Sequence, residues 1–581
     1  METSIAARFE TIAQRYPERL AVKDQERSLT YDQVKQAANR IARALLRRRG
    51  EGNEAIGILC EHGIDGIIAI LGILKAGKFY IAIDPSSPVD QIQAALIDAG
   101  ARLILSNKQN FRLAQDVGGS GCEVLDIQAS DDGLTPLSGI LRSISSDHLA
   151  TVLYTSGSTG KPKRISRTQR DVLQFASLGA LERGIHLEDR LSLLHHCGLG
   201  AASTHLFQSL LTGASLFPFD VKFQGIENLA RYLVAENITV CSLAPSLFRQ
   251  LGELLSQGDL RTSLRLITLV GAPVTRLDFE FYKKCFGPDT LLEILFGSTE
   301  AGGISSARID RKFSFPEYGF PAGYACRGKK IVLVDESGRA VGPGVVGEIA
   351  VTGPTVYRGY WRPPGRSLEK CVGDPAQTND RLCLTGDLGM MRSDGFLIYL
   401  GRKDDQVKIR GCRVEPGAVE AALFLHPLVK EAAVVACEGN DGEKFVAAYI
   451  VPRSDALPVD ELRGFLSQKL PDYMIPPVFV FLGSLPLRNG KLDRTALPLP
   501  GSGRPALSQA YVPAQSAVEQ KLIGIWQEVL AMRPIGIHDN FFDLGGHSLA
   551  ASRVITRVIE AFQLELPVKA LFDSPTVAEM A

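Results

Sequence analysis

Residues 154–164 read YTSGSTGKPKR and directly follow the apolar run LATVL at 149–153. The glycines allow backbone N–H groups to approach closely, and the hydroxyls and two lysines add donors and positive charge that suit phosphate oxygens. The segment is not a Walker A loop, because that pattern requires glycine where Thr155 stands and serine or threonine where Pro162 stands. A flexible surface turn explains the hydroxyls and lysines less well. We therefore interpret 154–164 as a phosphate-binding loop of a different kind.

The sequence around this loop predicts an α/β fold. Over about the first 400 residues, short apolar runs alternate with helical patterns, which indicates largely parallel sheets covered by helices. Such runs occur at 55–60, 149–154, 238–243 and 264–270. Later runs are separated by turns and favour an antiparallel meander or a small barrel, at 329–335, 347–353 and 395–401.

The length predicts several folding units, because 581 residues exceed what one ordinary core holds. A smaller α+β pattern follows the first part, with a helix around 416–425 and strands after it. Residues 497–516 are rich in Pro, Gly and Ser and lack periodicity, which is typical of a linker. From 517 onward, apolar residues recur at helical spacing and predict a small helical bundle, as at Val518, Leu522, Ile525, Trp526 and Val529.

Composition excludes several classes of function. Lys and Arg number 64, as do Asp and Glu, so nothing favours binding to nucleic acid or to an acidic membrane. The ten cysteines form no Cys-x-x-Cys pair, and we expect reduced thiols in a cytoplasmic protein. The apolar segment 67–74 is far shorter than the roughly 20 residues that span a bilayer. We expect a soluble protein that does not bind membranes.

Eight further stretches accompany the phosphate loop: LTYDQV (29–34), LKAGKFYIAID (74–84), FGSTE (296–300), GEIAVTG with YRGYW (347–361), LTGDLG (384–389), GRKDDQVKIRGCRVEPGAVE (401–420), LPDYMIP (470–476) and NGKLDR (489–494). In this order and spacing the chain resembles the adenylate-forming superfamily, specifically the adenylation domains of nonribosomal peptide synthetases. The tail DNFFDLGGHSL (539–549) is similar to a peptidyl carrier protein.

The resemblance implies four segments. A large N-terminal adenylation subdomain with two parallel-type sheets and a small barrel covers 1–402, and a small α+β C-terminal subdomain covers 403–500. A linker at 501–516 leads to a four-helix carrier domain at 517–581.

The resemblance also implies the reaction: a carboxylate and ATP give an acyl-adenylate and pyrophosphate, and the acyl group then passes to a thiol. Charge gathers on the α-phosphate in the transition state, so donors and Mg²⁺ are needed. By matching position, Thr299 contacts the α-phosphate, Glu300 binds Mg²⁺ and Phe296 stacks on adenine, where the family usually has tyrosine. Further nucleotide-binding positions are Thr155, Ser156, Gly157, Ser158, Thr159, Gly160, Lys163 and Gly271.

Other matched positions complete this expectation. Asp387 accepts hydrogen bonds from both ribose hydroxyls, with Arg402 nearby. Lys491 bridges carboxylate and phosphate oxygens, and Asp404 is the hinge about which the C-terminal subdomain rotates between the half-reactions. Arg164 replaces the usual glycine after the loop, and the sequence leaves its role open.

The acid pocket departs from the family pattern. Amino-acid-activating members place an aspartate against the substrate's α-ammonium, and that position falls on Gly200. Neither Asp nor Glu occurs between Arg190 and Asp220, so a small slip in register restores no carboxylate. A buried ammonium without a partner is costly. The remaining wall is neutral: Ala201, Thr204, Ser242, Thr268, Val270, Leu295, Gly303 and Ile304.

We therefore predict a substrate without a free α-amino group: an aryl, phenylpropanoid, keto, hydroxy or N-masked acid. The alternative is an ordinary amino acid held by carbonyl groups and other contacts.

Three roles are open to Ser548: a nucleophile, a helix N-cap or an attachment point. Its neighbour His547 is badly placed as a base, because adjacent helix residues do not face each other. The carrier-like setting favours attachment of 4′-phosphopantetheine by a separate phosphopantetheinyl transferase. The chain ends in SPTVAEMA, and we expect it to belong to a larger synthetase whose downstream domains or modules are partners. Competing hypotheses are a free-standing acyl-CoA ligase and a non-catalytic nucleotide-binding scaffold.

Overall fold

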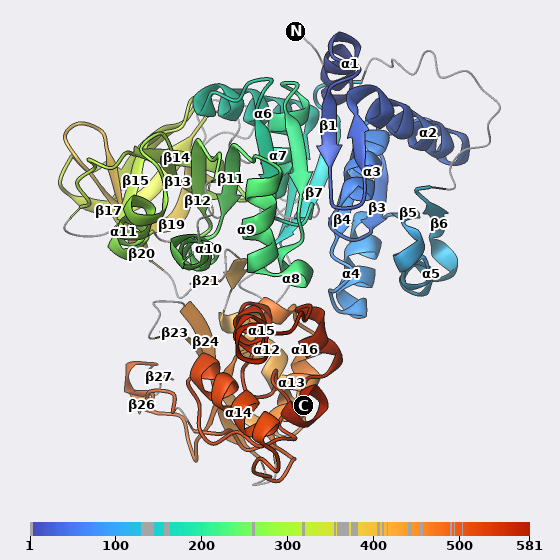
Figure 1. The fold of residues 1–581 in the computed structure, drawn as a ribbon. Helices are drawn as coiled ribbons and strands as arrows, with labels where there is room; N and C mark the ends of the chain where they lie inside the picture. Colours follow the sequence, from blue (N-terminus) through green and yellow to red (C-terminus); the bar gives the residue numbers. More distant parts are fainter. Residues whose placement is uncertain are drawn as a thin grey trace. The chain divides into compact units, whose positions relative to one another are not determined.

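The structure is a computed structural model of the full chain. It describes residues 4–128, 144–155, 163–198, 200–257, 262–272, 274–316, 320–353, 356, 371–372, 382–403, 407–409, 412–414, 416–439, 444–453, 457–488, 491–492, 494–501 and 503–581. The chain divides into two compact units, shown in Figure 1. The first comprises Met1–Thr155, Pro162–Asp220 and Ala230–Asp404, and the second comprises Asp405–Ala581 with Val221–Leu229. The predicted domain boundaries remain predictions.

A six-stranded sheet forms one part of the first unit. Its order is β6 (Glu123–Asp126), β5 (Leu103–Ser106), β3 (Ala55–Leu59), β4 (Phe79–Ile83), β7 (Leu149–Thr155) and β8 (Lys163–Thr168). Neighbouring strands are parallel except β7 and β8, which are antiparallel. The predicted strands at 55–60 and 149–154 are confirmed.

The helices of this region are α1 (Ile5–Arg15), α2 (Tyr31–Arg49), α3 (Ile64–Lys75), α4 (Val89–Ala99) and α5 (Phe111–Gly118). Helix α2 begins at Tyr31 because Thr30 and Gln33 form a reciprocal capping box with the first backbone N–H groups. Helix α3 is hydrophobic on all sides and almost wholly buried, as expected of a core helix. Short 3-10 turns lie at Lys108–Asn110 and Gly119–Gly121.

A second, larger sheet begins with β2 (Ser28–Thr30), β1 (Leu20–Lys23), β10 (Ser215–Pro218), β9 (Arg190–Leu193), β11 (Val240–Leu243), β12 (Leu266–Val270) and β13 (Leu291–Ser298). The strands from β1 to β13 are parallel, and β2 is antiparallel to β1. Helices of this part are α6 (Gln169–Arg183), α7 (Gly200–Leu210), α9 (Ile226–Ala235), α10 (Pro245–Gln257) and α11 (Arg276–Cys285). The short helix α8 (Val221–Gln224) and the first residues of α9, as far as Leu229, belong to the second unit.

The sheet continues as antiparallel strands β14 (Gly302–Ile309), β15 (Phe320–Ala325), β20 (Leu397–Arg402), β19 (Leu382–Met391), β17 (Val346–Thr352) and β16 (Lys330–Val334), and β18 (Cys371–Val372) pairs with β19. The later runs therefore form the predicted antiparallel arrangement. Together these sheets confirm the α/β class.

The second unit contains a three-stranded sheet of β23 (Val429–Glu438), β24 (Lys444–Pro452) and β25 (Val478–Phe481). Helices α12 (Pro416–Phe424) and α13 (Val459–Ser467) supply apolar side chains to the same core. Two-stranded pairs are β21 (Val407–Ile409) with β22 (Cys412–Val414) and β26 (Leu487–Arg488) with β27 (Lys491–Leu492). Short 3-10 turns lie at Asp472–Met474 and Arg494–Ala496.

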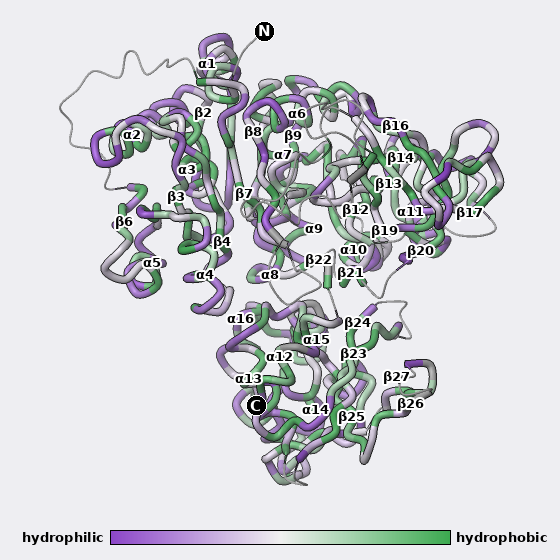
Figure 2. The backbone as a smooth tube through the Cα atoms, turned by 180° about the vertical axis from the view of Figure 1, so that it is seen from behind, coloured by the Kyte–Doolittle hydropathy of each residue, from purple (hydrophilic) through white to green (hydrophobic). Residues whose placement is uncertain are grey.

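Four helices form the C-terminal segment, as predicted: α14 (Ala517–Leu530), α15 (Ser548–Phe562), α16 (Lys569–Asp573) and α17 (Val577–Met580). Their core is built around Trp526, which is fully buried and packs edge-on against Phe541. Hydrophobic and hydrophilic stretches alternate along these helices in Figure 2. Such amphipathic helices bury one face each, which is how a segment of this length forms a core of its own.

Candidate active site

Asp387 and Arg402 lie opposite each other on the antiparallel strands β19 and β20. Arg402 Nη1 donates to Asp387 Oδ1 at 3.1 Å and to the Thr385 carbonyl oxygen at 3.0 Å. The Asp387 side chain is nearly buried, and its backbone N–H donates to Thr385 Oγ1. This arrangement fixes the carboxylate in place, because a charge-assisted pair holds one oxygen and the strand register holds the backbone.

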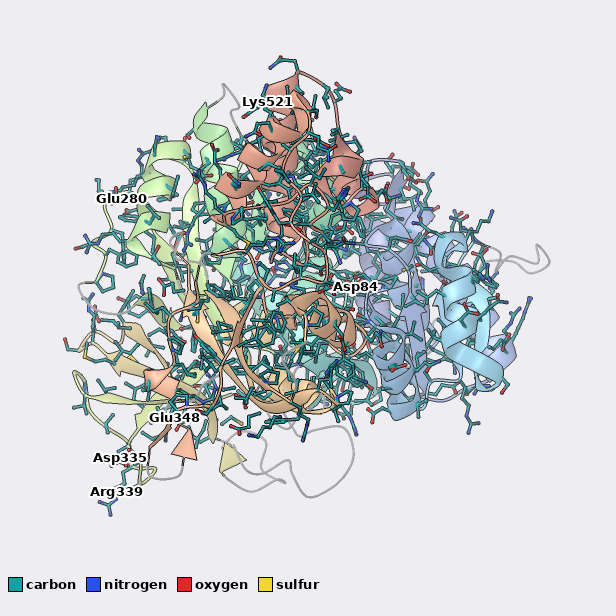
Figure 3. The ribbon with its side chains drawn as sticks, turned by 90° about the horizontal axis from the view of Figure 1, so that it is seen from below. Asp84, Glu280, Asp335, Arg339, Glu348 and Lys521 are labelled. Atoms are coloured by element: carbon teal, nitrogen blue, oxygen red, sulfur yellow. The ribbon has the colours of Figure 1, made fainter. Side chains whose placement is uncertain are left out.

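The turn before Asp387 depends on a glycine and on Glu348. Gly386 has φ +76°, which strains any larger residue, and a Cβ there would lie 2.7 Å from Arg402 Nη2 and displace the guanidinium. Glu348, labelled in Figure 3, accepts a hydrogen bond from the Gly386 N–H through Oε1 at 3.0 Å. Its Oε2 accepts one from Lys403 Nζ at 3.1 Å. The sequence did not single out Glu348, because the contact joins strands distant in the chain.

Tyr399 connects the carboxylate to the predicted adenine position. Its hydroxyl donates to Asp387 Oδ1 at 3.5 Å, and its ring centroid lies 5.5 Å from that of Phe296 on β13. Phe296 is half-buried, so part of its ring is accessible. The structure thus brings together an aromatic surface and a fixed carboxylate, which suit a base and its ribose.

Thr299 and Glu300 follow β13 in a turn that Arg167 anchors. Arg167 Nη2 donates to the carbonyl oxygens of both residues, at 3.1 Å for Glu300, and its guanidinium lies over the Phe175 ring at 4.7 Å. Arg167 is on β8, which directly follows the predicted phosphate loop. Sequence reasoning missed this residue, since only the fold shows that β8 and the turn meet.

The ends of the phosphate loop are also placed. Thr155 at the end of β7 and Lys163 at the start of β8 are paired across the antiparallel strands, while Ser156, Gly157, Ser158, Thr159 and Gly160 lie outside the described residues. Arg164, whose role the sequence left open, forms an ion pair with Asp98 of α4 at 2.6 Å. Asp98 also accepts a hydrogen bond from the Tyr154 hydroxyl. Arg164 therefore links β8 to α4. Gly271 ends β12 with φ +93°.

Magnesium ions are usually held by one or two carboxylates together with phosphate oxygens and water. Within the described ranges, no group of three His, Cys, Asp or Glu side chains could hold a metal ion by itself. Glu300 is a single carboxylate on an anchored turn, which fits an ion bound jointly with a nucleotide.

Gly200 is the first residue of α7 and lies beside this turn. A Cβ built there would lie 3.5 Å from Thr299 Cγ2 and 3.6 Å from Leu153 Cδ1, both ordinary contact distances. The predicted acid pocket and the predicted α-phosphate contact are therefore neighbours. The side chain of Ala201 lies outside the described residues, and Thr204 follows one turn along α7, where its hydroxyl donates to the Gly200 carbonyl oxygen at 3.4 Å.

The other predicted wall residues form two rows on the strands. Val270 and Leu295 are paired across β12 and β13, and both are half-buried. Ser242 and Thr268 are paired across β11 and β12, two residues further back on the same face. Gly303 lies against Leu295, because a Cβ there would be 3.3 Å from Leu295 Cδ1, and Ile304 is fully buried.

A buried charged pair lies directly behind this wall, which sequence reasoning missed. Glu293 Oε2 accepts hydrogen bonds from Arg183 Nε at 2.7 Å and from Thr268 Oγ1 at 2.9 Å. Both charged side chains are almost inaccessible, at 5% and 1% exposure for Arg183 and Glu293. Burial acts to lower the pKa of Arg183, but the charge of Glu293 and the hydrogen bond to it together outweigh burial, and the net shift is upward.

Buried histidines nearby are neutral at physiological pH. Burial lowers the pKa of His205, on α7, to about 3, and the charges of Arg183 and His195 add to the shift. Burial likewise lowers the pKa of His62 to about 4, and its Nε2 lies 2.7 Å from the Leu193 carbonyl oxygen. These rings bring no positive charge to the pocket region.

In the second unit, Lys491 begins β27, while its side chain and the whole of Asp404 lie outside the described residues. Ser548 is the first residue of α15, and the N-cap is His547, whose Nδ1 accepts a hydrogen bond from the Ala550 N–H at 3.2 Å. The N-cap role once open to Ser548 thus belongs to His547. A helix N-terminus favours a nearby anion such as a phosphodiester.

One sequence-based expectation about the cysteines is wrong. Cys383 on β19 is disulfide-bonded, and it lies opposite Cys371 of β18 in the antiparallel pair. Free thiols are found at Cys60, Cys122, Cys197, Cys241, Cys285, Cys326, Cys412 and Cys437.

None of the helices in the described part of the chain is long and apolar enough to cross a membrane.

Comparison with known proteins supplies three family matches. The model described as AMP-binding enzyme matches residues 9–361, that described as AMP-binding enzyme C-terminal domain matches 418–491, and that described as phosphopantetheine attachment site matches 520–581. Gramicidin S synthase 2 of Brevibacillus brevis is 36% identical over all of this chain, which spans 13% of that relative's length.

Two solved structures are similar over the whole chain. A four-domain nonribosomal peptide synthetase bound to AMP and glycine is 27% identical, with a TM-score of 0.61 and 42% of that chain covered. An artificially fused adenylation and carrier di-domain, NpsA-ThdA from Klebsiella oxytoca, is 23% identical, with a TM-score of 0.72 and 98% of that chain covered. The second likeness concerns the fold alone.

Proposed function

The chain belongs to the AMP-binding enzymes, as an adenylate-forming ligase of the nonribosomal peptide synthetase type with a phosphopantetheine carrier domain, and from this premise we propose that it activates a carboxylic acid lacking a free α-amino group and loads it onto Ser548. In the first half-reaction a carboxylate oxygen attacks the α-phosphorus of ATP, and the bond to the β-phosphate breaks to release pyrophosphate. In the second, the acyl group would pass from AMP, which leaves, to a thiol that a phosphopantetheine held on Ser548 would supply.

Residues of this chain divide that chemistry between them. Asp387, held by Arg402, accepts hydrogen bonds from the ribose hydroxyls, and Phe296 covers one face of the base. Thr299 donates to the α-phosphate, and Glu300 would hold Mg²⁺, which would supply positive charge beside the phosphates. Arg167 supports both by fixing their backbone carbonyl groups. Because each group is anchored before the nucleotide arrives, little reorganisation accompanies the reaction.

Two residues and a loop, whose side chains or positions lie outside the described residues, complete the proposal. Lys491 bridges the carboxylate and the α-phosphate, and the loop from Thr155 to Lys163 binds the leaving phosphates. Asp404 is the hinge that exchanges the lysine for the incoming thiol, since one cleft serves two half-reactions with different charge demands.

The observation that carries the substrate class is the absence of a carboxylate at Gly200. At this site the backbone faces Thr299, so a side chain there would reach the region where the acid meets the α-phosphate. Glu293 is no substitute, because its Oε2 already accepts from Arg183 and Thr268 and the side chain is buried. An α-ammonium in this pocket would lose its hydration without gaining an ionic partner, which is strongly unfavourable.

The substrate class is tested by ATP–pyrophosphate exchange with matched pairs, each an L-amino acid and the keto and hydroxy acids of the same skeleton. We expect exchange with the acids that lack an amino group. A clear preference for the L-amino acid would contradict the proposal. That outcome is the second candidate function, favoured by the relative solved with AMP and glycine.

Attachment at Ser548 is tested separately by mass. Intact protein treated with a phosphopantetheinyl transferase and CoA is expected to gain one phosphopantetheine, and Ser548→Ala is expected to gain none. His547→Ala offers a control for the helix start, because it removes the cap but keeps the hydroxyl. Further synthetase modules are proposed as partners that receive the loaded acid.

A further inference from the structure

The paired strands give the acid pocket two distinct levels. Val270 and Leu295 form an outer row near the carboxyl ends of their strands, where Gly200 and Thr299 also lie. Two residues further back, roughly 6.6 Å along the strands, an inner row consists of Ser242, Thr268 and Glu293.

Accessibility falls sharply between these rows. The outer row is half-buried, whereas Ser242, Thr268 and Glu293 are 4%, 0% and 1% exposed. The lateral space is limited too, because a Cβ built on Gly303 would lie only 3.3 Å from Leu295 Cδ1. The accessible part of the pocket therefore ends before the inner row.

Hydrogen bonds to the charged side chain of Glu293 fix the inner row in place. The hydroxyl of Thr268 donates to Glu293, an acceptor-only group when ionised, and Arg183 donates to the same oxygen. Replacing Thr268 would remove a hydrogen-bond donor from the buried carboxylate of Glu293. The loss of a partner costs a buried ionic group far more free energy than it costs an exposed one. We therefore do not expect a substrate to displace the side chains of the inner row.

The floor is also filled from behind. A Cβ built on Gly179 of α6 would lie 2.1 Å from Gln208 Nε2 and 3.2 Å from Arg183 Nη1. The polar ends of both side chains therefore pack against this glycine. Gln208 comes from α7 and is fully buried. The ion pair thus lies between the sheet and two packed helices, and densely packed interiors do not yield easily to extra volume.

We propose that the Thr268–Glu293–Arg183 network is the floor of the acid pocket and restricts the substrate to a short, non-aromatic carboxylic acid. Thr268 closes the pocket at the substrate's distal end, whereas Glu293 and Arg183 are positioning residues that act through it. This inference rests on the proposed function and narrows it, since aryl and phenylpropanoid acids would need the space that Thr268 occupies.

The test is a length series in ATP–pyrophosphate exchange with the full chain. Straight-chain α-keto acids of three to six carbons are compared with phenylpyruvate, benzoate and p-coumarate. We expect kcat/KM for the best short acid to exceed that for each aromatic acid about tenfold or more, the discrimination that a few misplaced atoms in a rigid pocket produce. Preference of the wild-type protein for an aromatic acid would overturn the proposal.

Thr268→Ala tests the floor directly, because it removes atoms at the end of the pocket. We expect the kcat/KM ratio of the six-carbon to the four-carbon acid to rise about tenfold, a change that loss of stability alone would not cause. Thr268→Ser keeps the hydroxyl and the ion pair, and it is expected to move the ratio in the same direction by about threefold.

Thr290→Ala is the matched control. Thr290 is also buried and its hydroxyl donates to the Leu264 carbonyl oxygen at 2.7 Å, away from the two rows. Equal shifts in this variant and in Thr268→Ala would overturn the proposal. L-amino acids of the same chain lengths are assayed in parallel. A preference for the amino acids would count against the proposed function, whereas the dependence of kcat/KM on chain length would still test the proposed floor.

Discussion

Gly200→Asp should convert the pocket toward amino acids. A Cβ at this position meets Thr299 Cγ2 and Leu153 Cδ1 at 3.5 and 3.6 Å, so the substitution requires no displacement of the backbone. Position 200 also opens an eleven-residue helix, α7, where the helix dipole favours a carboxylate. A Cβ therefore fits at position 200, and the start of the helix favours the charge of the carboxylate.

The expected size of the effect follows from the missing partner. A hydrogen bond to a charged group contributes about 1.5–3 kcal/mol, which corresponds to roughly 10- to 100-fold in kcat/KM. The gain applies to a substrate with an α-ammonium and not to a keto acid. The keto acid should lose activity, since its oxygen meets a carboxylate in place of a neutral wall.

The assay is ATP–pyrophosphate exchange with 2-aminobutyrate and 2-oxobutyrate, which share a four-carbon skeleton. We expect the ratio of kcat/KM for the amino acid to that for the keto acid to rise by roughly 10- to 100-fold in Gly200→Asp. Gly200→Asn has the same shape without the charge, and it should leave the ratio nearly unchanged. An unchanged ratio in the aspartate variant, or an equal rise in the asparagine variant, would refute the assignment of Gly200.

Three other perturbations address the hinge, the histidines and the ion pair. Asp404→Pro should leave pyrophosphate exchange largely intact but abolish acyl loading of Ser548, measured by intact mass; equal loss of both activities would exclude the hinge. Because burial and then the charge of Arg183 lower the pKa of His205 to about 3, the unfolded chain binds a proton between about pH 6.5 and 3 that the folded chain does not. The free energy of unfolding should therefore fall as pH is lowered through that window, and His205→Gln should flatten the slope in urea titrations. Glu293→Ala should destabilise the first unit by about 3–5 kcal/mol, whereas the double replacement Arg183→Met with Glu293→Leu should cost little, and similar values for both would contradict a buried ion pair.

The fold was largely predictable because the buried strands correspond to short apolar runs in the sequence. β3, β11 and β12 fall within the predicted runs, β7 exceeds its run by one residue, and the helix predicted at 416–425 is α12. Each of these signals comes from residues close together in the chain, so periodicity and turn residues suffice to find them. The order of the strands in the sheets needed the structure.

The supporting residues of the site were not predictable from sequence. Arg167 reaches the turn at Thr299 across 132 positions of the chain, and Arg183 reaches Glu293 across 110. A lone arginine on a predicted strand or helix is usually a solvated surface residue, and only tertiary contact shows that these two are buried. The cap at His547 was missed for a different reason, since histidine is not among the preferred N-cap residues.

The pocket combines two restrictions that are physically independent. Gly200 removes the partner of an α-ammonium at the mouth of the pocket, whereas the network behind Thr268 limits length at the other end. An amino acid would fail the first restriction because its charge would be buried against neutral groups, and the carboxylate of Glu293 behind the wall is already paired with Arg183. An aromatic acid would fail the second because its ring needs volume that the ion pair and its packed helices hold. Since the two proposed restrictions act on different atoms of the substrate, a short keto or hydroxy acid would satisfy both, and Gly200→Asp combined with the length series separates one restriction from the other.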